Sequence, residues 1–337
     1  MTRKILLILA LLICVTGLKA QTKQTFTNPL LPSGADPWAI YHNGYYYYTH
    51  TLGTRIALWK TKDLSALKDV APKTIWTPPA AGPNSAAIWA PELHLLDNKW
   101  YIYYTATDKA NKGDANRYVF VLENTSADPL EGTWVDKGKV NTGYSGLDGS
   151  VFEHRGIRYF MYSAYVGPQS VLVIAKMKNP WTLEGTQAII ASPTLPWEKF
   201  GGREILEGPE FLAGKKDEVF IAYSASACWA DEYALGMLVA KSSADLLDPH
   251  QWTKLASPVF RQSPEHNVFA TGHNAFVVSA DGKEHWILYH ANTGAGQGCD
   301  HRRSPRLQQF LWKEDGRPDF GVPVKIDSVL TAPTRND

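Results

Sequence analysis

Short segments rich in aromatic and β-branched residues recur along the chain, and five of them share one local pattern. Each has an aromatic residue, two further residues, a tyrosine, and then Thr, Ser or His. Such composition is typical of β-strands, and a recurrence about every sixty residues indicates a repeat architecture. We call the second aromatic residue of each segment a marker tyrosine; the five are Tyr48, Tyr104, Tyr162, Tyr223 and Tyr289.

Turn signals precede all five segments, so each segment is predicted to be the second strand of a β-hairpin. The turns are HNG at 42–44, DNK at 97–99, RGI at 155–157, GKKD at 214–217 and ADGK at 280–283. A third strand is predicted after four of them, within 57–67, 119–130, 172–183 and 236–247. Without a convincing amphipathic helix, this pattern predicts an all-β fold, a five-bladed β-propeller with four-stranded blades around a central axis. An irregular β-sandwich is the alternative.

The segment before each hairpin turn is predicted to be the first strand of its blade, nearest the axis. A polar or ionisable residue beside Gly or Pro recurs there, in ADPWAI, WAPELH, LDGSVF, LEGPEF and TGHNAF. Repeated geometry would bring these residues together in a funnel at one end of the axis. Because clustered like charges raise one another's pKa, we interpret the set as a functional site. Its members are Asp36, Glu92, Asp148, Glu207 and His273.

Each member alone also has a structural explanation. Asp36 and Asp148 stand in Asp-Pro and Asp-Gly, which are common turn dipeptides. Glu92 could pair with a neighbouring Arg or Lys and hold blades together, and a single histidine such as His273 is more often structural than metal-binding. Recurrence at one position of successive blades favours the functional interpretation.

The segments that follow the hairpins return to the same end and are expected to form the rim of the funnel. They lie around His50, at 107–117, around Tyr165, at 227–229 and at 292–303. The rim therefore offers Trp229 for stacking on a sugar, and the guanidinium groups of Arg302 and Arg303. Cys228 and Cys299 both fall on the rim and could form a disulfide if their geometry allows it.

Residues 1–20, MTRKILLILALLICVTGLKA, predict a cleavable signal peptide, because the apolar run is too short to cross a bilayer. The mature chain, 21–337, is expected to be a single domain that is secreted or periplasmic. A formal net charge of +1 gives no electrostatic reason to expect nucleic acid or a membrane as a partner. The 12 Trp and 16 Tyr residues suit both β-structure and the apolar faces of sugars.

The motifs ADPW, WAPELH, LDGSVF, LEGPEF and TGHNAF, in this order, closely resemble those of glycoside hydrolase family 43, over about residues 28–324. The resemblance implies a five-bladed propeller that hydrolyses arabinofuranosides or xylosides with inversion. In that chemistry one carboxylate activates a water molecule and one carboxylic acid protonates the departing oxygen.

The resemblance also implies a role for each matching acid. Asp36 matches the general base, Glu207 the general acid, and Asp148 the carboxylate that orients the acid and adjusts its pKa. Glu210 competes with Glu207, but Glu207 matches the family's Glu-Gly-Pro. The acid then needs a raised pKa, whereas the base must stay ionised.

Further residues match weaker features of the family. His273 matches an axial histidine that often lies beside a water-coordinated calcium ion in relatives, so a structural calcium ion near the axis is expected, with no cofactor required. Trp89 and Trp229 are expected to stack on the sugar, and Arg303 resembles an arginine that contacts it. Pro305 stands where the family more often has Ser or Thr, which makes the local loop assignment less secure.

The motifs NPWTLEG, WEKFG and YALGML make the chain similar to exo-acting α-L-arabinofuranosidases of the family. The predicted substrate is therefore arabinan or another arabinose-containing plant polysaccharide or oligosaccharide. β-Xylosidase and endo-α-1,5-arabinanase activity remain alternatives within the family, since rim loops decide the depth of the funnel. A sugar-binding propeller without catalysis is the alternative from another class, and it would not need three acids.

Overall fold

The computed structural model describes residues 24–335, and the predicted signal peptide lies outside this range. Consecutive strands pair antiparallel in groups of four, which we call blades 1 to 5. Blade 1 contains β2 (Ala35–His42), β3 (Tyr45–Thr51), β4 (Ile56–Thr61) and β5 (Lys73–Trp76). Blade 2 contains β6 (Ala86–Leu96), β7 (Lys99–Thr107), β8 (Tyr118–Asn124) and β9 (Val135–Lys139).

The remaining strands continue this order. Blade 3 contains β10 (Gly146–His154), β11 (Ile157–Val166), β12 (Gln169–Asn179) and β13 (Thr182–Ala191). Blade 4 contains β14 (Glu204–Ala213), β15 (Glu218–Ala225), β16 (Ala234–Lys241) and β17 (Thr253–Lys254), and a short parallel pairing of β12 with β14 joins it to blade 3. Blade 5 contains β18 (Phe269–Val278), β19 (His285–Asn292), β20 (Ser304–Trp312) and β21 (Pro318–Asp319).

Helical structure is confined to short 3₁₀ turns between strands. These are η1 (Leu64–Asp69), η2 (Asp114–Asn116), η3 (Pro196–Glu198), η4 (Phe200–Gly202), η5 (Pro249–Gln251) and η6 (Pro264–His266). Across residues 24–335, no helix has the length and apolar character needed to cross a membrane.

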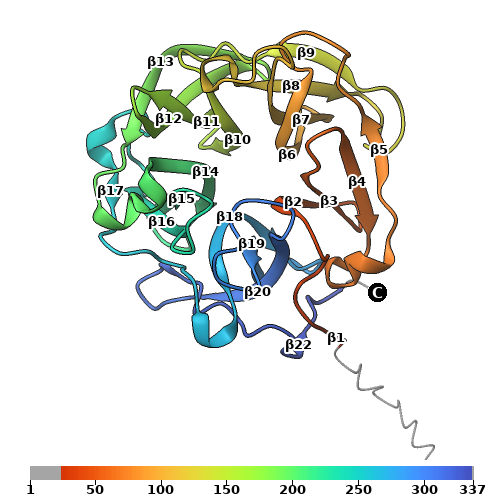
Figure 1. The fold of residues 1–337 in the computed structure, drawn as a ribbon, viewed down its shortest axis with the longest axis vertical. Helices are drawn as coiled ribbons and strands as arrows, with labels where there is room; N and C mark the ends of the chain where they lie inside the picture. Colours follow the sequence, from red (N-terminus) through yellow and green to blue (C-terminus); the bar gives the residue numbers. More distant parts are fainter. Residues whose placement is uncertain (1–23, 336–337) are drawn as a thin grey trace, which may run out of the picture.

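The blades surround a common centre, and the first strand of each lies nearest to it (Figure 1). This arrangement is the predicted β-propeller. The two ends of the described chain meet where β1 (Thr25–Phe26) pairs with β22 (Leu330–Thr331), with Thr25 opposite Thr331. The termini of the ring are therefore held to each other by backbone hydrogen bonds.

The predicted hairpins are confirmed, since the marker tyrosines lie on β3, β7, β11, β15 and β19, each paired antiparallel with the first strand of its blade. Third strands follow in the four predicted places, as β4, β8, β12 and β16. The third strand of blade 5, β20, was not predicted. It starts at Ser304, and Pro305 pairs opposite His290 at this strand start, a position where proline is tolerated.

The hydrophobic core is divided among the interfaces between neighbouring blades. All five marker tyrosines are fully buried. Each of five apolar clusters combines side chains of two adjacent blades, and blade 5 packs in this way on blade 1 through Leu288 and Tyr48. The ring is thus closed by the same kind of contact that joins its other blades.

Candidate active site

The first strand of every blade has an irregular register at the end where its predicted site residue lies. In each first strand a residue at such an irregularity adopts a left-handed backbone conformation; these residues are Asp36, Ala90, Asp148, Gly208 and His273, with Ala87 and Ala270 as second ones in β6 and β18. A bulge of this kind re-aims a side chain, and left-handed non-glycine residues are concentrated at functional sites. Asp36, Asp148 and His273 have φ values of 54°, 56° and 46°.

Hydrogen bonds from the preceding blade hold these residues in place. The backbone N–H of Asp148 donates to Thr105 Oγ1 at 2.9 Å, and that of His273 donates to Ser224 Oγ at 2.7 Å. The N–H of Asp36 donates to His290 Nδ1 at 3.1 Å. Thr105, Ser224 and His290 directly follow marker tyrosines. In these repeats the Thr, Ser or His therefore accepts a hydrogen bond from the backbone of the site residue on the next blade.

Two blades vary this arrangement. Ala90 donates to Thr51 Oγ1 at 2.7 Å, two residues beyond the expected Thr49. In blade 4 the left-handed residue is Gly208, whose N–H donates to Asp148 Oδ2 at 3.0 Å. Gly208 has φ 53°, and a Cβ there would lie 3.2 Å from the His273 ring. Glycine therefore avoids both the backbone strain of this conformation and a tight contact with the neighbouring imidazole.

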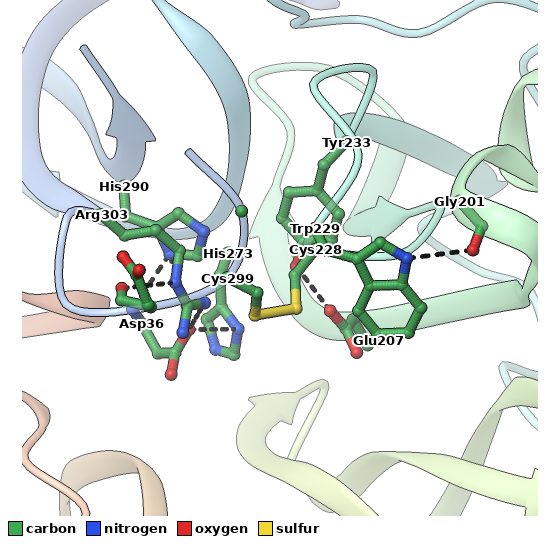
Figure 2. Close-up of a disulfide and its surroundings, with 12 residues drawn as sticks. Asp36, Gly201, Glu207, Cys228, Trp229, Tyr233, His273, His290, Cys299 and Arg303 are labelled. Carbon is green, nitrogen blue, oxygen red and sulfur yellow. Dashed lines mark hydrogen bonds and ion pairs between the residues drawn. A yellow bond between two sulfur atoms is a disulfide. The ribbon is translucent and has the colours of Figure 1, made fainter. Parts of the chain in front are cut away.

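The structure brings most of the predicted site residues to one cavity of about 470 Å³, although Glu92 and Arg302 are not part of its lining. A volume of this size is ordinary for a small-molecule site. Its lining includes the three proposed acids and the four residues expected to meet the sugar, namely Asp36, Asp148, Glu207, Trp89, Trp229, His273 and Arg303. In Figure 2, Asp36, His273, His290 and Arg303 form one group and Glu207, Tyr233 and Trp229 another, with a disulfide between them.

Asp36 is surrounded by donors and cations. Thr51 Oγ1 donates to Asp36 Oδ2 at 2.6 Å, and Arg303 Nη1 lies 3.3 Å from Asp36 Oδ1. His273 Nδ1 lies 3.4 Å from the same oxygen. Burial alone would raise the pKa of Asp36, but His273 and Arg303 outweigh it and hold the pKa below its usual range. Asp36 is therefore a carboxylate at all ordinary pH values.

The two imidazoles near Asp36 differ in charge. The His290 ring is fully buried, and burial together with Arg303 holds its pKa well below the ordinary value. Its Nδ1 accepts the Asp36 N–H, as a neutral imidazole can. Burial also opposes charge on His273, yet Asp36, Asp148 and Glu207 raise its pKa. His273 thus supplies positive charge to the acids while His290 supplies an acceptor.

Glu207 and Asp148 have the opposite electrostatic environment from Asp36. Burial raises the pKa of Glu207, although Tyr233 donates a hydrogen bond of 2.8 Å to its Oε1. Burial and the charge of Glu207 raise the pKa of Asp148 to about 8. Two interacting carboxyls titrate as a pair. Near neutral pH the pair therefore retains a proton, beside an ionised Asp36.

A second group of buried acids adjoins the site. Glu92 forms a hydrogen bond of 2.9 Å with His94 Nε2 and interacts electrostatically with the buried Glu210. The expectation that Glu92 pairs with Arg or Lys is therefore wrong. Burial and Glu92 raise the pKa of Glu210 well above its ordinary value. The described lining of the cavity includes Glu207 but not Glu210, which favours Glu207 as the residue that meets a ligand.

The comparisons with known proteins agree with this geometry. The family model "Glycosyl hydrolases family 43" matches residues 26–318. The chain belongs to this family.

Relatives within family 43 are similar over most of this chain. An extracellular exo-α-(1→5)-L-arabinofuranosidase of Streptomyces avermitilis is 41% identical over 90% of the chain, and an α-L-arabinofuranosidase of Humicola insolens is 35% identical over 89%. The chain spans 65% and 64% of the lengths of these two relatives. The crystal structure of an α-L-arabinofuranosidase from Lactobacillus brevis has a TM-score of 0.84 and 34% identity, covering 90% of this chain and 98% of that one.

The aromatic residues of this family 43 cavity differ in how much of the ring is free. The Arg117 guanidinium lies 3.9 Å from the centre of the Trp89 ring, so one face of Trp89 is already covered. Trp229 is 49% exposed, and its indole N–H donates to Gly201 O at 3.0 Å. Trp229 therefore has the more accessible surface for a sugar ring.

The disulfide between Cys228 and Cys299 that the sequence made possible is present. Cys228 follows β15 and Cys299 follows β19, and their Cα atoms are 5.2 Å apart. Both line the cavity. The bond therefore ties the rims of blades 4 and 5 together beside Trp229 and Arg303.

The calcium ion that the family 43 resemblance implies finds little direct support in the side chains. Among residues 24–335, no group of three or more His, Cys, Asp or Glu is placed to hold a metal ion. His273 offers nitrogen, whereas calcium prefers oxygen ligands. The residues do not fit direct coordination, and calcium held through water near His273 stays a prediction.

Several residues of the site were not predicted. Thr51, His290 and Tyr233 all contact the proposed acids or their backbone. For His290 a signal existed, because it follows marker Tyr289 at the position occupied by Ser224 in blade 4. Tyr233 carries no such signal, since its position depends on the path of the loop between β15 and β16.

Proposed function

We propose that this protein is an exo-acting α-L-arabinofuranosidase that removes arabinofuranosyl residues from arabinan or related plant oligosaccharides with inversion. The observation that carries the proposal is that one cavity is lined by Asp36, which lies beside His273 and Arg303, and by Glu207 and Asp148, whose pKa values are raised by burial. The arabinofuranosidase names of the relatives support the choice of sugar.

The proposed reaction uses each acid in the state that its surroundings favour. Asp36, as a carboxylate, removes a proton from a water molecule, whose oxygen attacks the anomeric carbon. Glu207, as a carboxylic acid, gives its proton to the glycosidic oxygen as the bond from that oxygen to the anomeric carbon breaks. Water and leaving group occupy opposite faces of the sugar, so the product is inverted.

The other charged groups tune these two acids. Asp148 interacts electrostatically with Glu207, and in the proposed reaction the proton that this pair retains is delivered from Glu207. His273 and Arg303 keep Asp36 ionised, and Arg303 is also placed on the cavity lining where it can donate to a sugar hydroxyl. Trp89 and Trp229 supply apolar surface at the mouth. No step in this proposal passes through a metal ion.

The protein is further proposed to act outside the cytoplasm, as a single catalytic domain over 21–337 after removal of residues 1–20. The extracellular description of the Streptomyces relatives supports this location.

The test measures release of sugar from p-nitrophenyl α-L-arabinofuranoside, p-nitrophenyl β-D-xyloside and linear arabinan, with NMR of the first product anomer. The arabinofuranoside should be cleaved best, linear arabinan should yield arabinose only, and the anomer should be inverted. Glu207→Ala should lose at least the roughly 10²–10⁴-fold typical of general acid catalysis.

A matched control is Glu184→Gln, an exposed residue on the outermost strand of blade 3. This variant should behave as wild type. Preferential cleavage of the xyloside would favour a β-xylosidase, and release of oligosaccharides from arabinan would favour an endo-arabinanase. Full activity in Glu207→Ala would refute the assignment of the acid.

A further inference from the structure

A second cleft, of about 740 Å³, is lined by residues of the same two chain segments that line the active-site cavity. Some residues of these segments, among them Arg203 and Trp229, line the active-site cavity. Others, among them Trp197, Phe200 and Glu232, line the second cleft. The two hollows are therefore neighbours, and we call the two segments that they share, 197–205 and 228–234, the ridge.

The top of this ridge carries two exposed aromatic side chains. Trp229 is 49% exposed and Phe200 is 44% exposed, and both are among the most exposed large apolar residues described. Isolated apolar residues on a surface need no explanation, but two on one ridge between two hollows suggest a ligand. Trp197, half-buried, continues the aromatic surface into the second cleft.

Hydrogen bonds hold the ridge rigid without any ligand. The Trp229 indole N–H donates to Gly201 O (Figure 2). The Phe200 N–H donates to Ser226 Oγ, and the Ala227 N–H donates to Phe200 O, both at 3.0 Å. Gly201 has φ 78°, and a Cβ there would lie 2.9 Å from the Trp229 indole nitrogen. The aromatic surface is thus fixed in position before binding, which lowers the entropic cost of binding.

The lining of the second cleft adds polar groups to this aromatic surface. Arg261 and Glu232 are exposed, and neither forms an ion pair within residues 24–335. Gln262 lines the same cleft. Aromatic faces combined with free donors and acceptors suit a pyranose or furanose chain, which has apolar faces and a hydroxyl-bearing edge.

We propose that the ridge of Trp229 and Phe200, with the cleft beyond it, binds the part of the polysaccharide that continues past the bond being cleaved. The inference rests on the proposed function, because the occupant is the arabinofuranosyl chain whose terminal residue enters the cavity. The chain leaves the cavity at the rim, and Trp229 is the exposed aromatic residue there. From Trp229 it passes over Phe200 to Trp197 and Arg261.

The test compares wild type, Phe200→Ala and Arg261→Gln on p-nitrophenyl α-L-arabinofuranoside and on α-1,5-arabino-oligosaccharides of increasing length. In wild type, kcat/KM should rise with chain length until the second cleft is filled. In Phe200→Ala this rise should shrink by about threefold to tenfold, the range that aromatic contacts produce, mainly through KM. Activity on the short p-nitrophenyl substrate should stay unchanged in both variants.

Leu311→Ala is the matched control, because Leu311 is 67% exposed on β20 and lies in neither hollow. It should keep the wild-type dependence on chain length. If wild type is active and both cleft variants keep its dependence on chain length, this inference is overturned while the proposed function stands. Equal loss on short and long substrates would also overturn it, because the ridge would then only support the cavity. A wild type that cleaves no arabinoside would overturn the proposed function as well.

Discussion

Removing the hydroxyl of Tyr233 tests how the structure sets the pKa of the proposed acid. Tyr233 donates to Glu207 Oε1 at 2.8 Å, and a donor of this kind stabilises the ionised carboxylate. Its ring lies parallel to the His290 ring, with centroids 5.8 Å apart and an interplanar angle of 2°. The ring also packs so closely on Gly272 that a Cβ there would lie 2.1 Å from it. Tyr233→Phe therefore keeps the packing and removes only the donor.

The expected shift follows from the strength of that hydrogen bond. A hydrogen bond to a charged group contributes about 1.5–3 kcal/mol, and one pKa unit corresponds to about 1.4 kcal/mol. Loss of the donor should therefore raise the pKa of the Glu207–Asp148 pair by about one to two units. Because hydrolysis needs the proton on Glu207, the basic limb of kcat/KM should move to higher pH by the same amount. The maximal rate should fall less than the roughly 10²–10⁴-fold expected when a general acid is removed.

The assay is the pH profile of kcat/KM on p-nitrophenyl α-L-arabinofuranoside for wild type, Tyr233→Phe and a matched Tyr289→Phe. The Tyr289 hydroxyl is buried and has no hydrogen-bond partner among the described residues, so its removal should leave both limbs in place. An unchanged basic limb in Tyr233→Phe, with an intact fold by circular dichroism, would refute the reasoning. A shift of that limb to lower pH would refute it as well.

Three further changes test other parts of the site. His273→Gln removes a cation that lowers the pKa of Asp36, Glu207 and Asp148, so both limbs of the pH profile of kcat/KM should move to higher pH; a profile that stays in place would contradict this. Gly208→Ala places a Cβ 3.2 Å from the His273 ring at φ 53°. The free energy of unfolding, measured by thermal unfolding, should fall by about 1–3 kcal/mol, and kcat should fall as well. Wild-type stability would contradict the expected strain. Replacing Cys228 and Cys299 by serine removes a cross-link between residues that are 71 positions apart in the sequence. The free energy of unfolding, measured by calorimetry, should fall by about 4 kcal/mol. A Tm equal to that of wild type would argue against a stabilising disulfide.

The repeat and the four residues Asp36, Asp148, Glu207 and His273 could be predicted from the sequence because equivalent positions of a propeller meet at its axis. The hydrogen bond between Glu92 and His94 could also have been predicted from the sequence. His94 lies two residues further along the same strand, and such residues share a face. The neighbour on the same strand, and not an Arg or Lys from another segment, is the partner of Glu92.

Other parts of the site depend on loop paths that local patterns do not determine. Tyr233 reaches Glu207 from a loop after β15, and the pairing of Cys228 with Cys299 depends on a Cα separation between two blades. The strand β20 was missed because Pro305 and the arginines before it indicate a loop, whereas the pairing with β19 decides the outcome.

The hydrogen bonds that run from each blade to the next also affect when the site can form during synthesis. Asp36 lies near the beginning of the described chain, but its backbone N–H donates a hydrogen bond to His290 on β19, close to the other end. A nascent chain that lacks β19 therefore has the proposed base but not the contacts that hold it in a left-handed conformation. Hydrolytic competence should belong to the completed ring and to no fragment of it, so premature termination before residue 290 should yield an inert product.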